Sequence, residues 1–122
     1  MFIRFVVGTD GEHHRSLTGV ITEARLLREE NKLSPYEEEW LEGIYDWFNS
    51  YLPCPPFSTG QFPTHAVAWF KAESSEFIAR MWDIVAIIED HDVPVHLLRS
   101  HNPGKIVYED EYQVLVEEWR RL

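Results

Sequence analysis

The single thiol of the chain is the first residue to weigh for chemistry. A nucleophilic cysteine reacts as the thiolate, which a nearby cation, a protonated histidine or a helix N-terminus must stabilise. Cys54 stands among prolines, in a segment between Leu33 and Phe70 that contains no Lys or Arg, and His65 is the nearest histidine along the chain. These surroundings predict a small apolar loop residue, so we assign no catalytic role to Cys54.

The histidines offer candidate metal ligands. A protein metal site needs side chains that converge, for example two histidines one helical turn apart. His13 and His14 are adjacent in sequence, which rarely lets both reach one ion, and His91, Asp92 and His96 could meet only through the fold. We expect solvated loop histidines, and we assign no metal and no cofactor to the chain.

A run of three acids, Glu109, Asp110 and Glu111, follows Tyr108. Two carboxyl groups held close together take different pKa values, so that one can serve as an acid and the other as a base. Consecutive acids at the end of a strand are also typical of a solvated turn, and we favour that interpretation. The chain contains no GxGxxG, P-loop, GxSxG or HExxH motif. We therefore assign no catalytic residue.

Length and composition fit one soluble domain. The 122 residues are 44% hydrophobic and 14% aromatic, which suffices for one core and exceeds the aromatic content of disordered chains. The single cysteine excludes an intramolecular disulfide. No apolar run approaches the length that spans a bilayer, and the N-terminus lacks a signal-peptide pattern. The sequence predicts a single domain over residues 1–122, located in the cytoplasm and without membrane contact.

The hydrophobic pattern predicts elements in the order β-α-α-β-α-β-β-β. Apolar residues recur at helical spacing over residues 18–30, 35–51 and 75–91, and the third of these segments is the most apolar. Apolar and β-branched runs predict strands at residues 2–7, 65–70, 93–99, 106–108 and 112–116.

Two local signals mark element ends. Ser34, Pro35 and Glu37 form the pattern of a capping box with proline at the first helical position. Pro103 followed by Gly104 is typical of a type II turn, in which the glycine adopts a positive φ.

These elements predict an α+β fold: a single-domain mixed sheet with a C-terminal antiparallel meander and helices packed mainly on one face. The strand at 65–70, the third helix and the strand at 93–99 are expected to form a right-handed parallel crossover. The last three strands are expected to form the meander. The face of the sheet without helices is expected to carry Arg99, Tyr108, Glu109 and Tyr112.

The charge balance bears on partners. Lys and Arg number 11 against 21 Asp and Glu, so the net charge is −10, and we expect no direct binding to nucleic-acid phosphates. The acids are clustered, and a surface of one sign accelerates association with a partner of the opposite sign. We assign partner binding to these clusters: Glu38, Glu39, Glu42, Asp46, Glu109, Asp110 and Glu111.

The resulting functional hypothesis is an acidic protein–protein interaction module rather than an enzyme. It would act as an inhibitor or adaptor on a basic, nucleic-acid-handling partner. One alternative is a small enzyme or ligand-binding domain, with a pocket between sheet and helices that uses Lys71, Arg99 and Tyr108. Another is that the acids only keep the chain soluble. A homodimer also fits, because the aromatic content is high for a small core.

Longer stretches of the chain resemble a family of small bacterial and phage-type proteins that has no established function. The similarity extends from Gly19 to Trp119, and its most distinctive parts are the segments at 69–71 and 103–110. The resemblance implies one intact domain and a setting among mobile elements or phages. It implies no activity, cofactor or catalytic residue.

Overall fold

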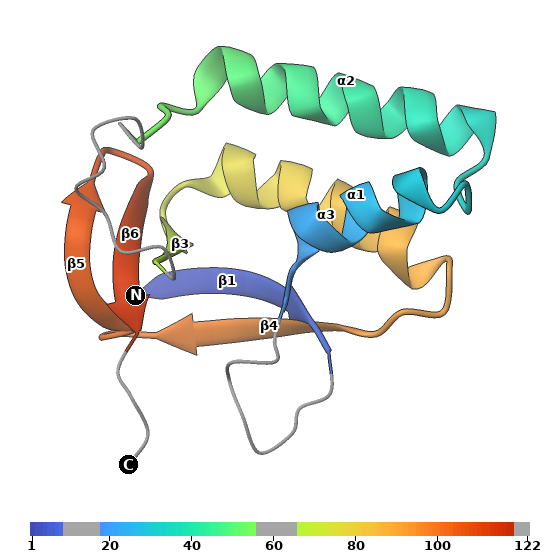
Figure 1. Cartoon of the computed structure of the whole chain (residues 1–122). Coiled ribbons are helices and arrows are strands. Elements are labelled where there is room, and N and C mark those ends of the chain that lie inside the picture. Colours follow the sequence, from blue (N-terminus) through green and yellow to red (C-terminus); the bar gives the residue numbers. More distant parts are fainter. Residues whose placement is uncertain (9–17, 56–65, 119–122) are drawn as a thin grey trace.

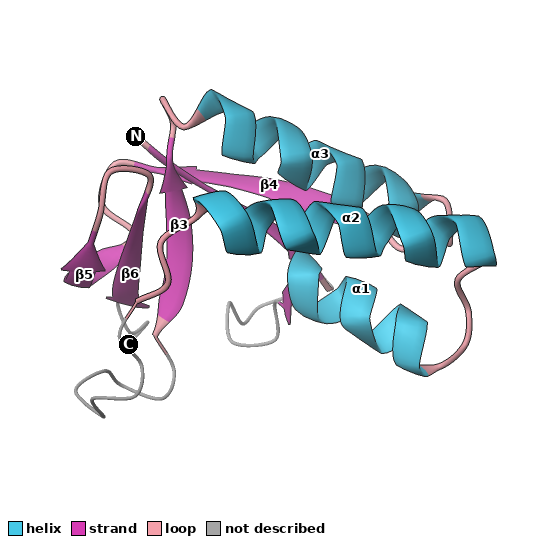
Figure 2. Ribbon diagram, turned by 90° about the horizontal axis from the view of Figure 1, so that it is seen from above, coloured by secondary structure: helices cyan, strands magenta, loops and turns pink. Residues whose placement is uncertain are grey.

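The computed structural model describes residues 1–8, 18–55 and 66–118. Figure 1 shows the helices stacked above one face of a sheet. The helices are α1 (Val20–Glu29), α2 (Pro35–Tyr51) and α3 (Ser75–Glu89). In the two views α1 and α3 lie next to the sheet, and α2 lies above them (Figures 1 and 2). The predicted α+β class, with helices on one face, is confirmed.

The strands pair in an order that differs from the chain order. They are β1 (Phe2–Val7), β2 (Thr18–Gly19), β3 (Val67–Lys71), β4 (Val95–Ser100), β5 (Gly104–Glu109) and β6 (Gln113–Glu118). The sheet runs β2-β1-β3-β6-β5, and β4 pairs with β1. Each of these pairs is antiparallel. The expectation of a mixed sheet is therefore wrong for the described residues, and the short strand β2 was not predicted.

The predicted parallel crossover and the predicted three-stranded meander each hold only in part. Strands β3 and β4 both pair antiparallel with β1, so they run parallel to each other, but β1 lies between them. Strands β5 and β6 form the expected hairpin, whereas β4 joins β1 along its whole length. The physical reason is that five of the six residues of β1 are apolar, so this strand gains most burial with neighbours along both edges. Consecutive strands pair only about two-thirds of the time. In this chain β4 pairs with the distant β1 instead of with a strand that is next to it in sequence.

The main core fills the space between the sheet and the helices. Helix α3 contributes the largest buried set, as predicted for the most apolar helix, and Ile84 and Ile88 have no exposed surface. Leu41, Ile44 and Phe48 line the buried side of α2. From the sheet, Phe5 and Val7 of β1 join the same cluster.

The start of α2 is fixed by its cap and by α3. The Ser34 hydroxyl accepts from the Glu37 amide at 3.2 Å, and the Glu37 carboxylate accepts from the Ser34 amide at 2.9 Å, which confirms the capping box. His91 Nε2 lies 3.0 Å from each Glu37 oxygen. The hydrogen bond from the Ser34 amide, aided by His91, lowers the pKa of Glu37. His91 is therefore a half-buried link between two helices rather than a solvated loop residue.

The face of the sheet without helices carries a second apolar cluster. Trp69, Val114 and Val116 are buried there, with Phe2, Val67 and Leu98 packed against them. Cross-strand partners share a face, so Glu109, which pairs with Val114, lies on this face as predicted. Arg99 pairs with Ile3 of the main core, and Tyr112 contacts Phe77 at 4.5 Å between ring centroids. Tyr108 pairs with Leu115, on the face opposite Trp69. The expected lining is thus wrong for Arg99, Tyr108 and Tyr112.

Gly104 is required for a reason other than the predicted one. Its φ lies outside the left-handed region, because Gly8 is the only described glycine with a positive φ. The type II assignment of the turn is therefore wrong. A Cβ at Gly104 would lie 2.3 Å from the carbonyl oxygen of Glu117 on the paired strand. The glycine allows two backbones to approach closely at the start of β5.

We expect Gly104→Ala to lower the free energy of unfolding by about 1–3 kcal/mol, because strand β5 must shift to make room for the methyl group. Urea denaturation measures this. Gly43→Ala is the matched control: apart from the backbone of its own helix and its chain neighbours, no atom of the described residues lies within 4 Å of its Cβ position. Alanine should stabilise the interior of α2 by about 1 kcal/mol. Unchanged stability of Gly104→Ala would contradict the close approach.

Candidate functional site

The acids assigned to partner binding do not form one surface. Glu38, Glu39 and Glu42 lie in the first half of α2, and Asp46 lies further along the same helix. The remaining acids belong to the β5–β6 turn. Figure 1 places the N-terminal end of α2 and the hairpin at opposite sides of the molecule. The two groups must therefore be judged separately.

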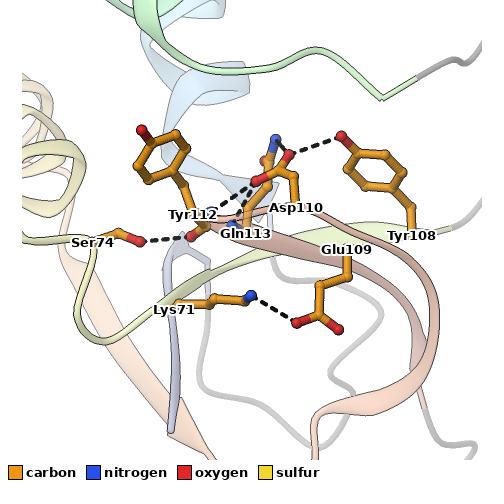
Figure 3. A network of polar contacts seen from close by, with 7 residues as sticks. All are labelled: Lys71, Ser74, Tyr108, Glu109, Asp110, Tyr112 and Gln113. Carbon is orange, nitrogen blue, oxygen red and sulfur yellow. Dashed lines mark hydrogen bonds and ion pairs between the residues drawn. The ribbon is translucent and has the colours of Figure 1, made fainter.

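In the hairpin, Asp110 is the centre of a hydrogen-bond network (Figure 3). Its Oδ1 accepts from the Tyr112 amide at 2.8 Å and the Gln113 amide at 3.1 Å. Its Oδ2 accepts from the Tyr108 hydroxyl at 2.9 Å and from Gln113 Nε2 at 3.1 Å. The buried Gln113 also donates to the Pro53 carbonyl at 2.8 Å, which ties the end of α2 to the turn.

This network shifts the pKa values of Asp110 and Tyr108 in opposite directions. Burial of the Asp110 carboxyl opposes ionisation, but hydrogen bonds from Tyr112, Gln113 and Tyr108 outweigh it and lower the pKa of Asp110. The hydrogen bond to Asp110 raises the pKa of Tyr108. Asp110 thus holds the turn together and has little capacity left for a partner.

The three residues assigned to a pocket make separate contacts. Lys71 Nζ lies 2.7 Å from Glu109 Oε2, on the same face as Trp69. Tyr108 pairs with Leu115 on the opposite face. Arg99 lies on β4, which β1 separates from β3. The register therefore does not gather these residues at one place, and the pocket stays a prediction without support from the geometry.

Within the described residues, Cys54 and the histidines do not come together as a catalytic or metal-binding group. Cys54 is exposed, and its thiol donates to the Pro55 carbonyl at 3.5 Å. His13 and His14, with His65, lie outside the described residues. Within residues 1–8, 18–55 and 66–118, no group of three His, Cys, Asp or Glu side chains could hold a metal ion. In the same part of the chain, no helix has the length and hydropathy needed to cross a bilayer.

Helix α2 leaves the predicted acids available. Glu39, Glu42 and Asp46 are exposed, and Glu38 is half-buried. The helix contains no Lys or Arg. Among the described residues, none of these four carboxylates forms an ion pair. The acidic surface of α2 is therefore not neutralised by the part of the chain that the structure describes.

One flank of α2 also exposes large aromatic side chains. Tyr36 and Tyr51 are 73% and 63% exposed, Trp40 is 38% exposed, and Trp47 is half-buried. We call these four residues the aromatic flank. Their positions recur at helical spacing, next to the stripe of Leu41, Ile44 and Phe48 that packs into the core.

The rings of the aromatic flank contact one another and α3. Ring centroids are 6.4 Å apart for Tyr36 and Trp40, and 5.3 Å apart for Trp47 and Tyr51. Trp47 also lies 5.1 Å from Phe77. The Arg80 guanidinium lies over the Trp47 ring, 4.9 Å from its centroid. This side of α2 is the strongest candidate site, because its exposed aromatic surface lies next to carboxylates that form no ion pair with the described residues.

Comparison of the chain with protein-family models, with curated proteins and with solved structures finds no match. The family resemblance and the setting that it implies therefore stay predictions.

We expect Asp110→Ala to lower the free energy of unfolding by about 2 kcal/mol, because four hydrogen-bond donors lose their charged acceptor. The lowered pKa means that Asp110 stabilises the fold above the carboxyl's ordinary pKa of about 4 and loses that effect as the pH falls further. Thermal unfolding of both proteins at several pH values measures this. The stabilities should converge at acid pH.

Glu111→Ala is the control, since Glu111 is exposed beside the same turn. It should leave both the stability and its acid dependence close to those of the wild type. A constant difference between Asp110→Ala and wild type at every pH would contradict the assigned role of the carboxylate.

Proposed function

We propose that this domain is a protein-interaction module that binds a basic segment of another protein through α2. The observation that carries the proposal is a single helix that combines exposed aromatic rings with carboxylates that form no ion pair among residues 1–8, 18–55 and 66–118. Surface helices ordinarily mix both signs of charge and bury their aromatics. On α2 the charges are of one sign and the aromatic flank stays partly or largely exposed. A cationic partner with apolar side-chain stems would compensate both features.

Electrostatics on α2 favour this use over stability alone. Glu38 and Glu42 are four residues apart, as are Glu42 and Asp46, and like charges at that spacing destabilise a helix by a few tenths of a kcal/mol. The positive end of the helix dipole compensates acids in the first turn only. Asp46 lies in the C-terminal half of α2, so the dipole does not explain it.

The structure reduces the partner-binding set that the sequence suggested. Glu109 is paired with Lys71, and Asp110 holds the turn, so α2 carries the proposal. A basic groove of a nucleic-acid-handling protein has the complementary charge, and occupying it would make the module an inhibitor or adaptor. The enzymatic alternative gains no support, because its residues do not come together.

We expect the double variant Glu42→Lys/Asp46→Lys to fold normally and to bind a short Lys/Arg-rich peptide about tenfold more weakly than wild type. Fluorescence anisotropy measures the affinity. Wild-type affinity should also fall as salt rises to the physiological level, where charges are screened beyond about 8 Å.

The charge-matched control is Glu73→Lys/Glu111→Lys, at two exposed positions outside α2. It changes the net charge equally and should retain most of the affinity. If both double variants lose affinity to the same extent, the acids act only through net charge and the α2 surface is not a binding site.

A further inference from the structure

The position of Gly43 in α2 has no explanation within the fold. It lies in the interior of a 17-residue helix, where alanine is the more stable choice. It is exposed, and a Cβ built there would meet, among the described residues, no atom within 4 Å apart from its chain neighbours and the backbone of its own helix. Neither a positive φ nor a close contact requires glycine here. What the glycine does provide is a stretch of exposed helix surface with no side chain above the backbone.

The neighbours of Gly43 on the helix surface are those of a cation site. Residues three and four positions apart adjoin one another on a helix. Glu39 and Trp40 precede Gly43 by four and three residues, and Asp46 and Trp47 follow it by three and four. Two carboxylates therefore border the bare backbone on one side, and two indole rings border it on the other.

Arg80 demonstrates that this flank accepts a guanidinium. Its guanidinium lies over Trp47 at 4.9 Å from the ring centroid and 3.8 Å from Asp83. Arg80 of α3 thus contacts both the ring of Trp47 and the carboxylate of Asp83. Among the described residues, no second cation lies over the rings of the aromatic flank.

We propose that α2 binds an arginine side chain of the partner at Gly43, between the carboxylates of Glu39 and Asp46 and the indoles of Trp40 and Trp47. This inference rests on the proposed function and specifies its partner chemistry. A guanidinium is planar, stacks on aromatic rings and bonds carboxylates with two parallel N–H groups. The ammonium of lysine is more strongly hydrated and does neither as well. The missing side chain at Gly43 lets the guanidinium approach the helix.

The test compares two peptides of equal length and charge, one with arginine and one with lysine at every basic position, in a glycine–serine background. We expect wild type to bind the arginine peptide at least about threefold more tightly at low salt. Gly43→Ala should raise the melting temperature by about 4 °C, lower the affinity for the arginine peptide about tenfold, and thereby abolish the preference for arginine.

Asn49→Ala is the matched control, because Asn49 is exposed on α2 away from the aromatic flank. It should leave the affinities for both peptides and their ratio unchanged. If both peptides bind wild type equally and Gly43→Ala binds like wild type, the arginine site is overturned while the proposed function stands. If neither peptide binds wild type at low salt, both fail. A lower melting temperature for Gly43→Ala would show that glycine serves the fold and would also overturn the site.

Discussion

Burial of β1 on both faces is the constraint on which the rest of the structure depends. Phe5, Val6 and Val7 are at most 3% exposed, and each fully buried side chain of this kind is worth about 1.5–3 kcal/mol. Alternate residues of a strand point to opposite faces, so β1 needs cover on both. The helices cover the face of Phe5 and Val7. The cluster around Trp69 packs against Phe2 on the other face.

Local features of the fold could be predicted from the sequence, and non-local ones could not. The capping box at Ser34 depends on residues three positions apart and was predicted atom for atom. The pairing of β1 with β4 joins segments that are far apart in the sequence, residues 2–7 and 95–100, and no short-range pattern encodes it. Gly104 was correctly singled out but for the wrong reason, since the backbone of Glu117 that excludes a Cβ comes from β6.

The candidate site was predicted in part. The acids of α2 follow from sequence, because Lys and Arg are absent from that segment. The exposure of the aromatic flank does not follow from the sequence, because α2 carries two apolar stripes at helical spacing and either could be the buried one. Only the packing on α1 and α3 decides that Leu41, Ile44 and Phe48 are buried and that Tyr36 and Tyr51 stay exposed. From the sequence, Asp110 was assigned to partner binding, because its hydrogen-bond donors include backbone amides that only the folded turn brings to its carboxylate.

The pairing of β1 with β4 also has a consequence for synthesis of the chain. Translation proceeds from the N-terminus, so the apolar segment Phe2–Val7 emerges long before Val95–Ser100, its longest partner. Until then one edge of β1 stays without its ladder, and an unpaired apolar strand is prone to pair with other chains. The nascent protein therefore depends on α1, which precedes β4 and contacts β1, to cover one face of β1 until β4 has been synthesised.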